Sequence, residues 1–505
     1  MLSLRRFPTQ LLVLVAALVA SAPAPTMAAP GDEPAVTREH AIVVGGRPLR
    51  YTSHAGRLPI RIGGTDEPRA HMFYVAYRAA PKPGETRPLT VIWNGGPGGS
   101  MLSILLGGQG PKRIVAGAVV DNPETLLDRT DLLYIDAVGA GFSRLATPAD
   151  AAAFYQTRGD NDAFVECILG WRRLFGAEDQ PVFLAGVSWG AYRVAAVAHA
   201  LTSRGVTVGG GAMMAGRNGL ARPGAERRFL PLGIVHYPRI ALVHGRLSPT
   251  LDGDIEKVER DALAWATGDY LPALARIDAL SGGEREAIAR RLALLSGLPL
   301  DRIDRRTLVV TPRQMTDGLL ADRGGKLQQF DMRQVAAPPT GPRRRGVPPG
   351  ERYLRGELGY RTSLAYLPLV WDAARVDGYL PSAAAPPDWN YLDGYYEDSL
   401  SRDARDRINR EEEAKGYPPG GQEQTLAEQA MRLDPAMRML VVHGRFDALP
   451  SSCSSVEAQL AEVDPDIRRR VDFRCVDSGH ALFANDEAVR KVVNADMRRL
   501  LDVRR

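Results

Sequence analysis

The sequence predicts an α/β fold with a mostly parallel central sheet, helices on both faces of that sheet, and an inserted, mainly helical cap. Two observations lead to this prediction. Short apolar runs alternate with segments of helical periodicity, a pattern typical of parallel strands linked by helices. This alternation fades between about residues 225 and 430, where helical patterns and a Pro/Gly/Arg-rich stretch replace it. With 505 residues, 45% of them hydrophobic and 24% charged, the chain can bury a large core.

Each expected element follows from local patterning. Residues 38–80 alternate in polarity and predict an antiparallel opening. Apolar runs bounded by turn residues then predict strands, and apolar residues at helical spacing predict helices. The strands are expected at 89–93, 131–135, 181–185, 211–215, 439–442 and 471–476, and the core helices at 161–175 and 191–201. Within the insertion, helices are expected at 254–279, 284–296 and 401–416.

The N-terminal segment has the organisation of a secretory signal peptide. Arg5 and Arg6 form a positive start, residues 11–20 form an apolar run too short for an ordinary membrane span, and small residues permit cleavage after Ala28. An uncleaved N-terminal anchor is the alternative. No later apolar run is long enough to span a membrane, so the mature protein is expected to lack a span and to be periplasmic or secreted. The predicted units are the signal peptide 1–28, a first core part 29–224, the cap 225–430 and a second core part 431–505.

The chain has three cysteines, too few for a disulfide scaffold. Cys167 falls in a helical pattern and is expected in the core. Cys453 and Cys475 could pair in an oxidising compartment, but their spacing leaves the pairing open.

Composition and motifs argue against several kinds of partner. The formal net charge of +5 is spread along the chain without a long basic run, so no nucleic-acid partner is expected. No His-Glu-x-x-His motif or Cys/His ligand spacing occurs, so no metal is expected. The Gly-rich loop at 93–100 is neither a P-loop nor a dinucleotide fingerprint, so no cofactor is expected. The oligomeric state stays open.

The motif GVSWG at 186–190 is the strongest local sign of chemistry. It lies between an apolar strand and a helix, the context that a nucleophile elbow needs. Small residues at both ends let the chain turn sharply and expose the Ser188 hydroxyl, and the start of the following helix favours developing negative charge. Ser188 is therefore the predicted nucleophile.

A nucleophilic serine needs a histidine base, and the histidine needs a carboxylate that orients it. On a strand–turn–helix scaffold of this kind, the chain order is serine, acid, histidine. Of the eight histidines, only His443 and His480 follow the cap. His443 ends a buried strand and is expected to pack there, whereas His480 lies in a loop after a predicted strand. Asp447 lies in the loop HGRFDALP, where the acid belongs. Ser188, Asp447 and His480 form the predicted triad; a turn-forming Asp and an ordinary loop His are the alternatives.

The Gly-rich loop WNGGPGGS at 93–100 follows the first parallel strand. Its backbone N–H groups can face an oxyanion, and one such donor contributes about 3–4 kcal/mol to transition-state stabilisation in hydrolases. The second donor would be the N–H of Trp189, the residue after the nucleophile. A purely structural Gly turn is the alternative.

These motifs together resemble a known family. WNGGPGGS, YIDAVGAGFSR, GVSWGAY, HGRFD and SGH are similar to the motifs of the serine carboxypeptidase family of α/β hydrolases, most of all to its bacterial exported branch. The resemblance runs from about residue 40 to the C-terminus and is weakest in the cap. It implies an α/β-hydrolase fold, a triad of Ser188, Asp447 and His480, oxyanion N–H groups from Gly96 and Trp189, and a substrate-carboxylate site at Asn94 and Gly95.

The sequence departs from the family pattern at two positions. Val187 stands where the family has an acidic residue before the serine, and Gly108 stands where it has a glutamate. In the family these two carboxyls bind the C-terminal carboxylate of the substrate. The leading hypothesis is an exported serine exopeptidase, carboxypeptidase-like, that acts on peptides through an acyl-enzyme. An esterase or acyltransferase acting on acyl esters with the same fold, and a non-catalytic binding protein with a hydrolase scaffold, are the alternatives.

Overall fold

The computed structural model describes residues 35–81, 84, 86–222, 224–251, 253–337, 347–369, 425–449, 451–483 and 486–502. The predicted signal peptide and the helix expected at 401–416 lie outside these described residues. Within them, no helix is both long enough and apolar enough to cross a membrane.

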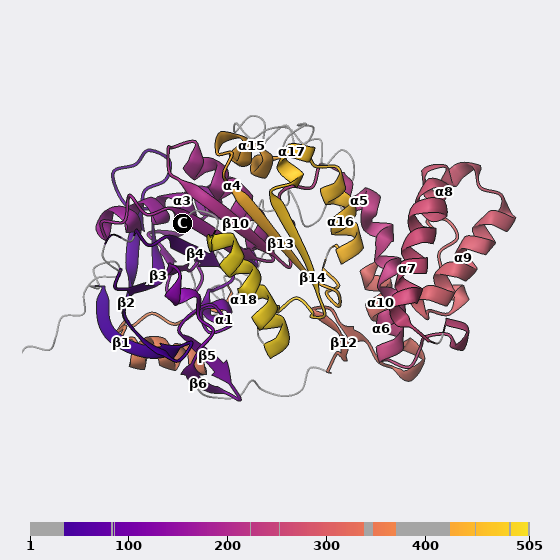
Figure 1. The fold of residues 1–505 in the computed structure, drawn as a ribbon, viewed down its shortest axis with the longest axis horizontal. Helices are drawn as coiled ribbons and strands as arrows, with labels where there is room; N and C mark the ends of the chain where they lie inside the picture. Colours follow the sequence, from indigo (N-terminus) through magenta and orange to yellow (C-terminus); the bar gives the residue numbers. More distant parts are fainter. Residues whose placement is uncertain are drawn as a thin grey trace, which may run out of the picture.

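A mixed ten-stranded sheet forms the centre of the molecule (Figure 1). The described strands run in the order β1-β2-β3-β7-β4-β9-β10-β13-β14, with β8 beside β3. The first three strands are antiparallel, and every pair from β7 to β14 is parallel. Both the antiparallel opening and the parallel core are therefore confirmed. The strands are β1 Val36–Val44, β2 Arg47–Ile60, β3 Ala70–Ala79, β4 Leu89–Trp93, β7 Asp131–Ile135, β8 Arg144–Leu145, β9 Val182–Val187, β10 Val208–Met214, β13 Arg438–Gly444 and β14 Val471–Val476. A separate hairpin pairs β5 Lys112–Val115 with β6 Ala118–Asp121.

Helices cover both faces of the sheet, as predicted. Strand β9 shows why, because it is buried along its whole length and its alternate side chains enter different cores. Val182 and Leu184 join the core under α3 and α4, while Phe183 and Ala185 join the core on the other face. The first face carries α2 Ala151–Phe154, α3 Thr157–Leu174, α4 Trp189–Thr202, α15 Leu426–Leu433 and α17 Pro465–Arg468, and the second carries α1 Leu102–Leu105 and α18 Glu487–Asp502. Cys167 of α3 is fully buried, in agreement with its predicted core position.

The cap stands beyond the β13–β14 edge of the sheet and has a hydrophobic core of its own (Figure 1). Helix α9 illustrates its local design. Ser281 and Glu284 form a capping box at its start, and Gly297 ends it in the left-handed conformation. The cap elements are α6 Tyr237–Val243, α7 Ile255–Trp265, α8 Leu271–Ala275, α9 Gly282–Ser296, α10 Pro312–Gly318, and the short hairpin of β11 Leu327–Gln328 and β12 Asp331–Val335. Helices α5 Ala225–Phe229 and α16 Cys453–Ala461 lie between this cap and the sheet.

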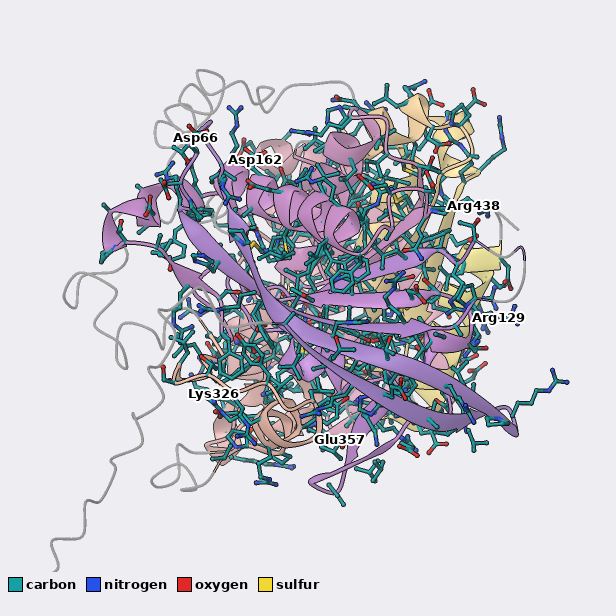
Figure 2. The ribbon with its side chains drawn as sticks, turned by 90° about the vertical axis from the view of Figure 1, so that its left-hand side faces the viewer. Asp66, Arg129, Asp162, Lys326, Glu357 and Arg438 are labelled. Atoms are coloured by element: carbon teal, nitrogen blue, oxygen red, sulfur yellow. A yellow bond between two sulfur atoms is a disulfide. The ribbon has the colours of Figure 1, made fainter. Side chains whose placement is uncertain are left out.

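The insertion also returns to the core. After α11 Pro349–Arg352, the side chains of Tyr353, Leu354 and Tyr360 enter the hydrophobic core on the second face of the sheet. Figure 2 shows the long antiparallel strands of the sheet running diagonally across the molecule, with the charged residues Asp66 and Glu357 labelled near its edges. The insertion therefore supplies both an outlying helical unit and part of the hydrophobic core on the second face of the sheet.

Candidate active site

Ser188 occupies a sharp turn between β9 and α4. Its backbone φ of 58° and ψ of −129° are unusual for a residue with a side chain, and such strain is typical of a nucleophile elbow. The turn requires glycine before it, because a Cβ at Gly186 would lie 1.9 Å from the carbonyl oxygen of Gly190. The Ser188 N–H donates to the Met214 carbonyl at 2.8 Å, which anchors the turn to the neighbouring strand β10. The predicted elbow is thus present, at the N-terminus of a 14-residue helix.

Asp447 and His480 meet in the loops after β13 and β14. The His480 Nδ1 and the Asp447 Oδ2 are 2.7 Å apart, the distance of a strong hydrogen bond. The Asp447 side chain is fully buried and that of His480 is 13% exposed. Burial raises the pKa of Asp447, against the opposing effects of His480 and the Leu449 N–H. The contact leaves His480 Nε2 as the nitrogen that can exchange a proton with a substrate.

The three predicted triad residues follow the ends of strands that share one direction. Ser188 follows β9, Asp447 follows β13 and His480 follows β14, and these strands are joined in the sheet through β10. Because the carboxyl ends of parallel strands lie at one edge of a sheet, these residues are presented on the same side. His443 ends β13 and is wholly buried, where burial lowers its pKa to about 4. It packs in the core as predicted.

The Gly-rich loop presses against the elbow. A Cβ at Gly95 would lie 2.6 Å from both the Ser188 Cβ and the Trp189 backbone nitrogen, so only glycine allows this approach. Gly96 follows with a φ of 119°. The Asn94 side chain stabilises the loop itself, since its Oδ1 accepts from the Gly95 N–H and its Nδ2 donates to the Ser100 carbonyl. Gly95 and Trp189 therefore lie next to the nucleophile, while the Asn94 amide is engaged within the loop.

A buried ion pair between α4 and α3 holds the Gly-rich loop in place, and the sequence prediction missed it. Arg193 of α4 is fully buried and donates through Nε to Asp160 of α3 at 2.8 Å. Its Nη1 also donates to the Asn94 carbonyl at 3.0 Å. The detectable signal was a single arginine within the otherwise apolar helix AYRVAAVAHAL. Arg193 thus links the helix that follows the nucleophile to the Gly-rich loop.

The cap hairpin contacts the base and acid loops directly, which the sequence prediction also missed. The His480 N–H donates to the Phe330 carbonyl at 2.6 Å, and the two side-chain rings lie 5.3 Å apart. On the acid loop, the Met332 N–H donates to the Phe446 carbonyl, and the Ala448 N–H donates to the Gln329 carbonyl. The hairpin therefore contributes to the backbone framework of the site and not to the cap alone.

The two positions that depart from the family pattern carry no acid in the structure. Val187 is a buried apolar residue at the end of β9. At Gly108, an added Cβ would lie 2.8 Å from the Cδ of Arg490, so the arginine stem occupies the space next to this residue. No carboxyl group at either position is available to hold the C-terminus of a peptide.

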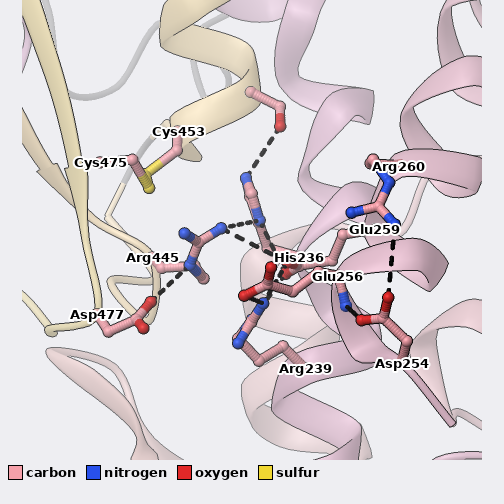
Figure 3. Close-up of polar contacts among 11 residues, drawn as sticks. His236, Arg239, Asp254, Glu256, Glu259, Arg260, Arg445, Cys453, Cys475 and Asp477 are labelled. Carbon is pink, nitrogen blue, oxygen red and sulfur yellow. Dashed lines mark hydrogen bonds and ion pairs between the residues drawn. A yellow bond between two sulfur atoms is a disulfide. The ribbon is translucent and has the colours of Figure 1, made fainter.

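A disulfide joins Cys453 of α16 to Cys475 of β14, with Cα atoms 5.7 Å apart. The pairing that the sequence left open is thus formed. The bridge connects the helix after the acid loop to the strand that leads into the base loop. The bridge, which Figure 3 shows, thus cross-links the segment that follows Asp447 to the strand that precedes His480.

The double substitution Cys453→Ser/Cys475→Ser is expected to lower the free energy of unfolding by about 3 kcal/mol, since the bridge closes a loop with a sequence separation of 22 residues. Urea unfolding of oxidised wild type and of the double variant measures this difference. Dithiothreitol should destabilise the wild type to the same extent and leave the double variant unchanged. A loss well below 1 kcal/mol would show that the bridge does not constrain the unfolded chain.

Asp136, directly after β7, is a buried carboxyl beside the Gly-rich loop. Burial raises its pKa to about 7, against the N–H groups of Met101 and Phe142, and the Met101 N–H donates to its Oδ1 at 2.6 Å. Because the pKa in the folded state exceeds that in the unfolded state, folding takes up a proton between about pH 4 and pH 7. The stabilising contribution of this proton to the free energy of unfolding is full below pH 4 and is lost as the pH rises to 7. Each pKa unit is worth about 1.4 kcal/mol.

Asp136→Asn is therefore expected to remove a pH dependence of about 4 kcal/mol. Relative to wild type, the variant should gain stability progressively from pH 4 to pH 7.5. Urea unfolding of both proteins at several pH values tests this. Stability curves that stay parallel across this range would contradict the raised pKa.

Among the described residues, no group of three His, Cys, Asp or Glu side chains is placed to hold a metal ion. The groups that the site brings together come from side chains and backbone already described. These are a strained serine, a histidine hydrogen-bonded to a buried carboxylate, and a Gly-rich loop against the nucleophile's turn. This set is suited to acyl transfer through a covalent serine intermediate.

The parallel sheet with helices on both faces, the elbow after β9 and the acid and histidine after β13 and β14 define an α/β hydrolase. Residues 47–208 match the family model described as serine carboxypeptidase. This match spans the segment from β2 to the start of β10, and together with the fold it supports a serine carboxypeptidase-like α/β hydrolase.

Similar solved structures include several hydrolases. A prohormone-processing carboxypeptidase from Saccharomyces cerevisiae, Kex1Δp, is 15% identical, with 89% of this chain and 91% of that chain covered and a TM-score of 0.47. Proline iminopeptidase from Mycobacterium smegmatis is 13% identical, with 88% and 99% covered and a TM-score of 0.34. Esterase E22 is 13% identical, with 90% and 100% covered and a TM-score of 0.37. These likenesses are too distant to bear on activity. No curated protein matches the chain significantly.

Proposed function

We propose that this serine hydrolase is an exported serine-type exopeptidase, carboxypeptidase-like, that cleaves peptides through an acyl-enzyme. The observation that carries the proposal is the 2.7 Å contact between His480 and the buried Asp447, on the same side of the sheet as the strained Ser188. Export is supported by the predicted signal peptide and by the Cys453–Cys475 disulfide, a bond typical of oxidising compartments.

In the proposed mechanism, the Ser188 oxygen attacks the scissile carbonyl carbon while its proton passes to His480 Nε2. Asp447 holds the Nδ1–H tautomer and stabilises the imidazolium that forms. The N–H groups of Gly96 and Trp189 are the proposed donors to the oxyanion, and Asn94 and Gly95 the proposed neighbours of the substrate carboxylate. Collapse of the intermediate breaks the C–N bond, and the departing amine takes the proton from His480. A water molecule then attacks the acyl carbon while its proton passes to His480 Nε2. The bond between this carbon and the Ser188 oxygen breaks, and Ser188 takes the proton back from His480.

An esterase or acyltransferase is the second candidate, and a specific observation favours it. Val187 and Gly108 provide no carboxyl to recognise a charged C-terminus, and the Arg490 stem lies against Gly108. In such a site, substrate recognition would depend on the acyl group of the substrate more than on a free C-terminal carboxylate. The acyl-enzyme chemistry is the same in both candidates, so the substrate decides between them.

The test has two steps, beginning with a fluorophosphonate probe on folded mature protein. Labelling establishes an activated serine, and its absence would support a binding protein on a hydrolase scaffold. The second step compares three substrates with one acyl part: an N-blocked dipeptide, its C-terminal amide and an N-blocked amino-acid ethyl ester. A carboxypeptidase should cleave the free dipeptide about 100-fold faster than the amide, equivalent to about 2.7 kcal/mol of transition-state binding. Rapid ester cleavage with little dipeptide cleavage would favour the esterase.

A further inference from the structure

We propose that Arg445 is a positioning residue that fastens the acid loop, the histidine loop and the cap together, and thereby sets the geometry of Asp447 and His480. The inference rests on the proposed triad. Arg445 is two residues before Asp447, directly after β13. Its main-chain N–H donates to the Val476 carbonyl at 2.9 Å, so its backbone already belongs to both loops.

The Arg445 side chain also connects the acid loop to the histidine loop. Its Nε donates to Asp477 Oδ1 at 2.7 Å, and Asp477 is three residues before His480 (Figure 3). Arg445, His236 and Asp447 line one cavity, which places the arginine next to the buried acid. One arginine therefore spans from the acid loop to the start of the histidine loop.

The other side of the guanidinium reaches the cap. Arg445 Nη1 lies 3.3 Å from His236 Nδ1 and 3.6 Å from Glu259 Oε2, and Glu259 belongs to helix α7. His236 is buried just before α6, and burial lowers its pKa, which favours the neutral imidazole. The Glu259 side chain is 10% exposed and that of Arg445 is 22% exposed. In such surroundings a charge pair is screened less than at an open surface, so its partners are held more firmly.

Two further groups contact the cluster formed by Arg445, Asp477, His236 and Glu259. Arg239, within the cap, donates to Glu259 through both Nε and Nη2, at 3.0 and 2.6 Å. Ser454, next to the disulfide in α16, has its Oγ 2.9 Å from His236 Nε2. Glu259 is thus bound by two arginines, of which Arg445 alone also contacts the Asp477 side chain beside the histidine loop. This difference separates a positioning role from a purely stabilising one.

The matched pair Arg445→Gln and Arg239→Gln tests the inference in the full mature protein. Three readouts are compared: the second-order rate of fluorophosphonate labelling, kcat and KM on the best substrate, and the melting temperature. Misplacement of a catalytic group by about 1 Å can lower a rate by about 100-fold. We expect Arg445→Gln to lower the labelling rate and kcat by about 10- to 100-fold with KM within about threefold of wild type. Arg239→Gln should lower the melting temperature but keep the labelling rate within about twofold.

Two further variants guard against misfolding of Arg445→Gln. Arg445→Lys keeps a donor for Asp477 and should recover part of the lost rate. Asp477→Asn removes the negative charge of a partner whose side chain is 60% exposed, and should fold while lowering the labelling rate by about three- to tenfold. Equal labelling rates for wild type, Arg445→Gln and Asp477→Asn, or equal losses in Arg445→Gln and Arg239→Gln, would overturn the inference alone. A wild type that is folded yet unlabelled would instead overturn the proposed function, and the inference with it.

Discussion

Replacing Ser188 with alanine is expected to abolish fluorophosphonate labelling and to lower kcat by about 10⁶-fold, the scale of loss when a triad nucleophile is removed. The reason is chemical, since in the turn GVSWG between β9 and α4 the nucleophilic hydroxyl is that of Ser188, next to the Gly-rich loop. Alanine retains the same backbone conformation and Cβ, so the protein should stay folded. Labelling by gel fluorescence and turnover of the best substrate measure the effect.

The matched control for this substitution is Ser203→Ala. Ser203 is an exposed serine directly after the same helix, at the end away from Ser188. It should label and turn over like wild type. Labelling that persists in Ser188→Ala would show that another residue carries the nucleophile and would remove the basis of the proposed triad.

Asp447→Asn is expected to lower kcat by about 10⁴-fold, with KM changed much less. The asparagine amide can hold His480 in the wrong tautomer and cannot stabilise the imidazolium that forms when Ser188 loses its proton. Because Asp447 is fully buried and hydrogen-bonded to His480, no solvent molecule replaces the lost carboxylate easily. Steady-state kinetics on the best substrate give the measurement.

Asp472→Asn serves as the control for this second substitution. Asp472 lies on β14, its side chain is 61% exposed, and it pairs only with Arg438 among the described residues. Its removal should leave kcat within about twofold of wild type. A loss below about tenfold in Asp447→Asn would mean that another group orients His480. The first alternative would be Asp331, whose charge acts on Asp447 from the cap hairpin.

The core strands could be predicted from sequence because each is a short apolar run bounded by turn residues. Strands β4 and β7 coincide with the ranges expected from Leu89 and Asp131. Strand β2 was not recognised as one continuous strand, because its 14 residues include several polar side chains that are tolerated near the sheet edge. Local patterning thus identifies buried strands better than long antiparallel ones.

The site could be predicted in part, for a related reason. The elbow, the acid and the base each lie at the end of a strand with a local motif, and the structure brings Asp447 and His480 into contact. Contacts made across long sequence distances left no such signal. The hydrogen bond from His480 to Phe330 of the cap hairpin, the support from Arg193 and the cluster around Arg445 all depend on how remote segments pack.

The insertion of the cap between the two core parts has a consequence for biosynthesis. In the proposed triad, Ser188 precedes His480 by about 290 residues. At translation rates of about 5–20 residues per second, the elbow emerges from the ribosome about 15 to 60 s before its base exists. Strands β13 and β14, which carry the acid and the base, join the sheet beside β10 only after the cap has been made. A nascent chain of this design therefore carries the serine before its base has been made, and in the proposed mechanism hydrolysis begins only when the last strands have docked.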